Sequence, residues 1–209
     1  MTRTNGTSVA EEICNSITHG LGSVFGVVAL VILIFTAIKS NEPMKIVAFS
    51  IYGGSLAILY LMSTLYHSLM FTKANRVFRI LDHAAIFLFI AGSFTPFILI
   101  TIQNTARWVM LSAIWVIAIS GIIYCIFNIR KTNILLLFYL LMGWLGLFIF
   151  KPLFQYQHVQ GLTLLVIGGV LYTTGTIFYQ WKKLVFHHGI WHVFVLTATV
   201  CHFISIIHL

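Results

Sequence analysis

Long apolar runs alternate with short polar segments along the whole chain. An α-helix rises about 1.5 Å per residue, so roughly 20 residues are needed to cross a hydrocarbon core of about 30 Å. Seven runs approach this length, and the segments between them contain Lys, Arg, Asn or Gln. The pattern predicts an all-α integral membrane protein, a seven-transmembrane-helix bundle, with spans at residues 20–38, 46–71, 80–102, 108–127, 134–150, 161–181 and 187–207.

The composition supports this prediction. Hydrophobic residues make up 60% of the 209 residues and charged residues only 8%, with a mean hydropathy of +1.01. Soluble domains usually carry about 25% charged residues, so an ordinary soluble enzyme is excluded. The three cysteines show no CxxC spacing, which indicates neither a disulfide framework nor a thiolate metal site.

Basic residues give the net charge of +8 and predict the orientation in the bilayer. They lie in the connections between runs and not along one face, so nucleic acid is not expected as a partner. Cytoplasmic loops of membrane proteins carry an excess of Lys and Arg. A cytoplasmic N-terminus gives an inside set of Arg3, Lys73, Arg76, Arg79, Arg130, Lys131, Lys182 and Lys183 and an outside set of Lys39, Lys45, Arg107 and Lys151. Because the inside set is larger, we expect the N-terminus in the cytoplasm and, after seven spans, the C-terminus outside.

Two parts of the chain are expected, a cytoplasmic N-terminal leader at residues 1–19 and a transmembrane domain at residues 20–209. The leader contains acidic residues and the apolar run after it is long enough to stay in the bilayer, so no cleavable signal peptide is predicted. Several polar residues of the leader follow one another at spacings of three or one. A capped helix on the cytoplasmic surface would explain them without catalysis. These residues are Glu12, Asn15, Thr18 and His19.

Three histidines and one carboxylate fall at one predicted depth. His67 lies near the end of the second span, Asp82 near the start of the third, and His188 and His192 in the first turns of the last span. All these helix ends map to the cytoplasmic side. The spacing of four puts the last two rings on one helix face. Polar groups within a membrane are costly and are by default functional, so the cluster predicts a site.

Zinc is the expected cofactor of this cluster. Three imidazoles with an open fourth position are typical of catalytic Zn²⁺, because structural zinc sites usually fill all four positions with protein ligands. We therefore expect His67, His188 and His192 to bind the metal. The alternatives are three histidines bonded to carbonyls at helix interfaces, or a bis-histidine haem between the second and seventh spans. His202 maps near the outer leaflet, too far away to take part.

A general base has few candidates, because the carboxylates of the chain are Glu11, Glu12, Glu42 and Asp82. Glu42 maps outside, so we expect Asp82 to be the base, with the two leader glutamates less favoured. The alternative role for Asp82 is a favourable interaction with the dipole at a helix start. Ser63 precedes His67 by one helical turn and is expected to orient Asp82 or a water molecule, unless it only bonds back to its own helix.

Four segments carry a family resemblance, "EEICNSITHGLG", "YGGSLAILYLMSTLYHS", "LDHAAIFLFIAGSFTPF" and "HHGIWHVF". In this order and spacing they resemble the bacterial hemolysin III proteins, within the progestin and adipoQ receptor family. The resemblance implies seven helices, a cytoplasmic N-terminus and an intramembrane zinc near the cytoplasmic side. It implies that His67, His188 and His192 hold the zinc and that Ser63 and Asp82 belong to the same site.

The resemblance and the residues together favour one function over two others. We expect a zinc-dependent hydrolase of lipid amides, similar to a ceramidase, in the cell membrane (inner or plasma membrane) of a bacterium. Its partners would be the bilayer and a membrane lipid substrate or ligand. The main alternative is a receptor or regulator with a structural zinc. A pore-forming hemolysin is less favoured because the spans carry no continuous polar stripe.

Overall fold

The computed structural model describes residues 8–209, which form helices and contain no strand. The helices are α1 (Val9–Lys39), α2 (Pro43–Ser68), α3 (Asn75–Thr101), α4 (Ala106–Asn128), α5 (Thr132–Trp144), the 3₁₀ helix η1 (Leu145–Ile149), α6 (Phe150–Tyr156), α7 (Val159–Gln180) and α8 (His187–Ile207). Among the described residues, seven stretches are long and apolar enough to cross a membrane, with α5, η1 and α6 together forming the fifth. The predicted seven-span helical bundle is confirmed.

Large apolar side chains cover much of the outer surface of the bundle. Phe127 is 80% exposed, Phe148 is 79% exposed, and many leucines, isoleucines and valines are exposed as well. Water would penalise such a surface, whereas lipid chains would not. The protein therefore has the surface of a multi-pass membrane protein.

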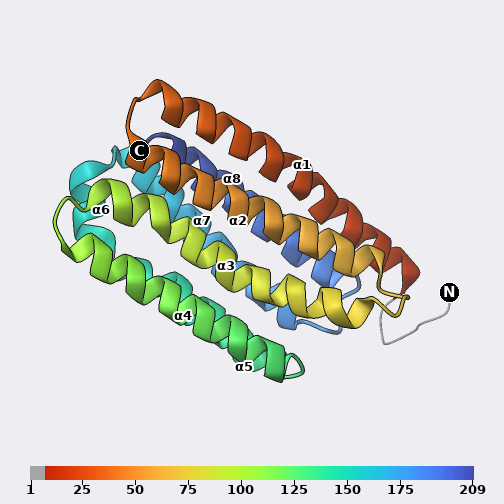
Figure 1. Ribbon diagram of the computed structural model, residues 1–209. Coiled ribbons are helices and arrows are strands. Elements are labelled where there is room, and N and C mark those ends of the chain that lie inside the picture. The colour runs from red at the N-terminus through yellow and green to blue at the C-terminus, as the bar shows by residue number, and fades with distance from the viewer. Residues whose placement is uncertain (1–7) are drawn as a thin grey trace.

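The helices run side by side with α3 near the middle (Figure 1). Every residue from 91 to 101 of α3 is buried, which makes this half of α3 the most enclosed part of the bundle. α1 lies at one edge and packs against both α2 and α8. α1 begins at the end of the bundle opposite to the end where α8 finishes, as an odd number of spans requires (Figure 1). The side of the bilayer that each end faces stays a prediction.

Helix α1 begins earlier than expected. Ser8 caps it in a capping box with Glu11, and the helix then continues without a break through residue 19 to Lys39. The expectation of a separate helix on the membrane surface was therefore wrong for residues 9–19. The polar side chains Glu12, Asn15 and His19 are buried against the bundle, whereas Ile13 and Ile17 are exposed. The spanning helix therefore includes this segment, although its hydropathy is low. Residues 1–7, including Arg3, lie outside the described part of the chain.

Small residues allow α1 and α2 to approach closely. A Cβ atom added at Gly26 would lie 3.0 Å from Cα of Ala57, and one added at Gly53 would lie 2.9 Å from Cα of Leu30. Close packing through small residues is a usual way for membrane helices to associate. It brings the polar face of α1 within reach of α2.

The fifth span is longer than predicted. The expected end at residue 150 falls where η1 gives way to α6, and the helical path continues to Tyr156. Pro152 does not stop it, because this proline lies in the first turn of α6, where its missing N–H has no helical partner to lose.

Candidate metal centre

The predicted metal ligands meet at one end of the bundle. His67 lies in the last turn of α2, and His188 and His192 lie in the first two turns of α8. One ring nitrogen from each histidine lies within 4.8 Å of the other two. Their helix ends lie at the same end of the bundle (Figure 1). These three histidines form a cluster that could hold a metal ion.

The ring nitrogens of this cluster fit a metal ion. The Nε2 atoms of His67, His188 and His192 are all buried without a hydrogen-bond partner. An unpaired buried polar atom costs about 1–3 kcal/mol, and an ion with bonds of about 2.0–2.1 Å would satisfy all three at once. The ring centroids are 4.6 to 5.0 Å apart, which leaves no space for the macrocycle of a haem between the rings.

Helix α1 supplies polar contacts to two of the ligands. Oε2 of Glu12 lies 2.7 Å from Nδ1 of His67, and both side chains are buried. Oγ1 of Thr18 lies 3.0 Å from Nδ1 of His192. The two rings are thus held at Nδ1 while Nε2 stays free, which is the usual arrangement of histidines that bind a metal through Nε2.

Ser63 contacts a fourth histidine and neither Asp82 nor a ligand. Its Oγ lies 2.7 Å from Nδ1 of His19, and both residues are buried. The ring of His19 stacks on that of His192, with centroids 3.4 Å apart and planes at 15°. Nε2 of His19 is buried and has no partner. His19 therefore lies directly beside the candidate metal ligands.

Asp82 is buried in α3, on the wall of the cavity that His19 also lines. Its Oδ2 lies 3.5 Å from Nδ1 of His83, a contact between neighbours on the same helix. The structure thus places Asp82 at the cavity and gives it no hydrogen bond to His67, His188 or His192.

Other histidines bond to backbone carbonyls. His83 lies 3.0 Å from the carbonyl oxygen of Arg79, and His187 lies 3.2 Å from that of Phe178. His202, further along α8, approaches the carbonyl oxygen of Leu165 on α7 at 3.2 Å. The His83 contact lies within α3, whereas the contacts of His187 and His202 join α7 and α8.

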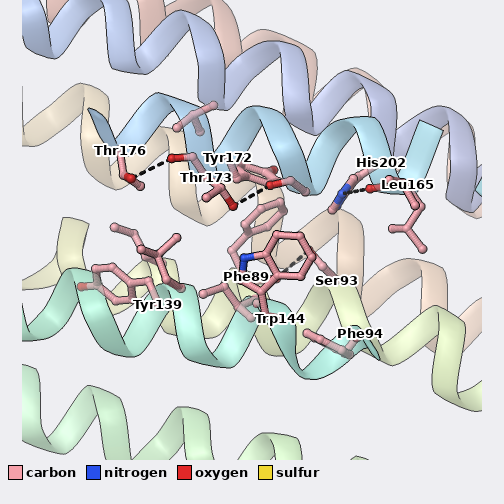
Figure 2. A pocket seen from close by; sticks show the side chains of 18 of the residues that line it. Phe89, Ser93, Phe94, Tyr139, Trp144, Leu165, Tyr172, Thr173, Thr176 and His202 are labelled. Carbon is pink, nitrogen blue, oxygen red and sulfur yellow. Dashed lines mark hydrogen bonds between the residues drawn. The ribbon is translucent and has the colours of Figure 1, made fainter. Parts of the chain in front are cut away.

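An apolar cavity of about 250 Å³ extends from His19 and Asp82 into the bundle. Side chains of α3, α5, α7 and α8 form most of its wall. Figure 2 shows part of this wall, where aromatic side chains such as Phe89 and Trp144 face the ring of Tyr172. Most of the hydroxyl groups on the wall already bond within the protein, for example Ser93 to the carbonyl of Phe89. The cavity is therefore suited to an alkyl chain.

Helix α1 contributes to the site in a way that the hydropathy pattern did not predict. Glu12, Thr18 and His19 were expected on a surface helix, whereas the structure puts all three beside the cluster. A signal was present in the sequence. Glu12 and His19 continue, at spacings of three and four, the same inward stripe as the small residues of α1, namely Asn15, Gly22, Gly26 and Ala29.

Comparisons with known proteins agree with these observations. Residues 7–203 match the sequence profile described as "Haemolysin-III related". Hemolysin-3 from Bacillus cereus is 46% identical over 200 residues, which cover 95% of this chain and 91% of the relative. The Hemolysin-3 homolog of Bacillus subtilis (strain 168) is 43% identical over 201 residues, covering 96% and 94%. The human monocyte to macrophage differentiation factor is 30% identical over 207 residues, covering 94% and 83%.

Proposed function

The chain belongs to the haemolysin-III-related family, and on this premise we propose that it is a zinc-dependent membrane hydrolase of lipid amides, similar to a ceramidase. The observation that carries the proposal is a three-histidine cluster in which His192 stacks on His19, a residue of the wall of an apolar cavity. A protein with this arrangement can hold a metal and the chain of a lipid next to each other. We place it in the bacterial cell membrane with its N-terminus in the cytoplasm.

In this proposal, different residues bind the metal, transfer the proton and position the site. His67, His188 and His192 hold Zn²⁺, which when bound polarises a carbonyl group and makes water more acidic. The oxygen of a water molecule adds to the carbonyl carbon of the amide while the carboxylate of Asp82 takes its proton. The C–N bond then breaks, and Asp82 passes the proton to the nitrogen of the leaving amine, which leaves a carboxylic acid as the second product. Ser63 acts through His19, whose ring it holds at the cavity wall.

The substrate would be bound by its chain. The cavity of about 250 Å³ lies among apolar and aromatic side chains, some of which Figure 2 shows. Its wall also includes Asp82 and His19. An acyl chain in the cavity would bring its amide carbonyl to this end, because the polar groups that could receive it lie there. Burial of each methylene is worth about 0.8 kcal/mol, so the chain supplies most of the binding energy.

A receptor or regulator with a structural zinc is the second candidate. The contacts of Glu12 with His67 and of Thr18 with His192 favour it. They would position the histidines for a metal ion whether or not the protein catalyses a reaction. The relatives named Hemolysin-3 suggest cytolysis as a third function. A pore is less favoured, because the spans carry no continuous polar stripe that could line one.

The test is an Asp82→Asn variant assayed for hydrolysis of short-chain ceramides and other lipid amides in detergent. The amide is nearly isosteric with the carboxylate but cannot accept the proton, so turnover should fall by about 10²- to 10⁴-fold while zinc content stays near wild type. Glu42→Gln is the matched control, since Glu42 is exposed at the other end of α2, and it should keep full turnover.

Three results would contradict parts of this proposal. Full turnover in a zinc-loaded Asp82→Asn protein would exclude Asp82 as the base. A zinc-loaded wild type that hydrolyses no lipid amide would exclude the hydrolase and favour the regulator. A wild type without metal would exclude the metal centre itself.

A further inference from the structure

We propose that helix α1 determines how tightly the site binds its metal, with Glu12 and Thr18 acting as positioning residues for His67 and His192. The inference rests on the metal centre of the proposed function and is independent of hydrolysis. It gives α1, which contributes none of the three ligands, a defined part in metal binding.

Glu12 fixes the tautomer of His67. A neutral imidazole carries one N–H, and an ionised carboxylate can only accept a hydrogen bond. With Glu12 ionised, the 2.7 Å between Oε2 and Nδ1 is a hydrogen bond only if Nδ1 carries the proton. The lone pair is then on Nε2, the buried atom without a partner. His67 is thus prepared to bind a metal through Nε2.

Thr18 fixes the tautomer of His192 through a hydroxyl group, in place of a carboxylate. The hydroxyl of Thr18 has one proton, and it lies 2.9 Å from the carbonyl oxygens of Cys14 and Asn15. Because the carbonyls take that proton, the hydroxyl oxygen must accept at 3.0 Å from the Nδ1–H of His192. Nε2 of His192 again keeps its lone pair and has no partner.

The charge of Glu12 also matters in this environment. Its side chain is buried together with His67, where a lone carboxylate would be strongly destabilised. Three neutral imidazoles around a dication leave two positive charges, and Glu12 offsets one of them through His67. A carboxylate that accepts from a ligand histidine also makes the ligand more basic, which strengthens its bond to the metal.

The experiment measures the zinc dissociation constant of the full-length protein in detergent by competition with a chelator. Glu12→Gln keeps the shape and removes the charge, so we expect the constant to rise about 10- to 100-fold. Glu42→Gln removes the same charge at the other end of α2, where Glu42 pairs with Lys45, and should stay within about threefold of wild type. Thr18→Val should weaken binding about tenfold, whereas Thr36→Val, whose hydroxyl bonds only to the carbonyl of Ile32, should not.

Two further measurements separate positioning from a general loss of structure. The melting temperature of the metal-free Glu12→Gln protein should equal that of metal-free wild type, while the stabilisation by added zinc should shrink. The visible spectrum of the cobalt(II)-loaded protein, which reports the ligand environment, should change in Glu12→Gln and stay the same in Glu42→Gln.

The outcomes distinguish this inference from the proposed function. Wild-type affinity and an unchanged cobalt spectrum in both Glu12→Gln and Thr18→Val would overturn the inference and leave the metal centre standing. The expected loss of affinity in a protein that hydrolyses no lipid amide would support the inference and overturn the hydrolase. A wild type that binds neither zinc nor cobalt would overturn both.

Discussion

At the scale of single residues, the metal centre depends on histidines whose Nε2 atoms face one another. Replacing His188 or His192 with alanine removes one of three protein ligands, so we expect zinc affinity to fall at least tenfold. His202→Ala removes a ring from the same helix that bonds to a carbonyl of α7, and its zinc content should stay near wild type. Metal analysis of the three purified proteins after dialysis against a chelator is the measurement. Equal zinc retention in all of them would reject the ligand assignment.

Sequence reasoning found the cluster because its residues are unusual for a membrane span. A histidine or aspartate in an apolar run is visible without a structure, and the basic loops placed His67, Asp82 and His188 at one depth. The contact of Ser63 with His19 could not be predicted in the same way. It depends on the rotation of α1 and α2 about their axes, which spacing along one helix does not determine.

At the scale of helices, the packing of α1 on α2 positions Glu12 beside His67. Gly53→Ala would place a methyl group 2.9 Å from Cα of Leu30, so the two helices must move apart, at a cost of roughly 1–3 kcal/mol. Its neighbour Gly54 has open space around the same position, and Gly54→Ala should be neutral or stabilising. We expect a lower melting temperature and weaker zinc binding for Gly53→Ala only. Identical melting curves for the two variants would contradict this interface.

Hydropathy predicted the number and order of the spans but not their ends. The start of α1 was missed because Glu11 and Glu12 lower the hydropathy of a turn that is nevertheless helical. The end of the fifth span was missed because Lys151 and Pro152 are usual stop signals, although both lie in the first turn of a new helical segment. Ends are difficult to predict because capping and burial decide them, and both depend on neighbouring helices.

At the scale of the whole molecule, α1 begins at one end of the bundle and α8 finishes at the other, as seven candidate spans require. The excess of Lys and Arg predicts which side is which. A reporter fused after Leu209 should be detected outside the cytoplasmic membrane, and one inserted near Arg130, between α4 and α5, should be detected inside. Protease or labelling access in intact cells measures both. A cytoplasmic reporter after Leu209 would reverse the orientation and put the metal centre at the outer face.

The metal centre joins the first helices of the chain to the last one. During synthesis, Glu12, Thr18 and His67 leave the ribosome early, whereas His188 and His192 emerge only near the end of translation. A nascent chain that stops before residue 187 therefore holds one of the three ligands, too few to retain an ion. In the proposed function, metal uptake would therefore follow the insertion of α8, and a bound ion would mark a chain in which the first and last helices have come together.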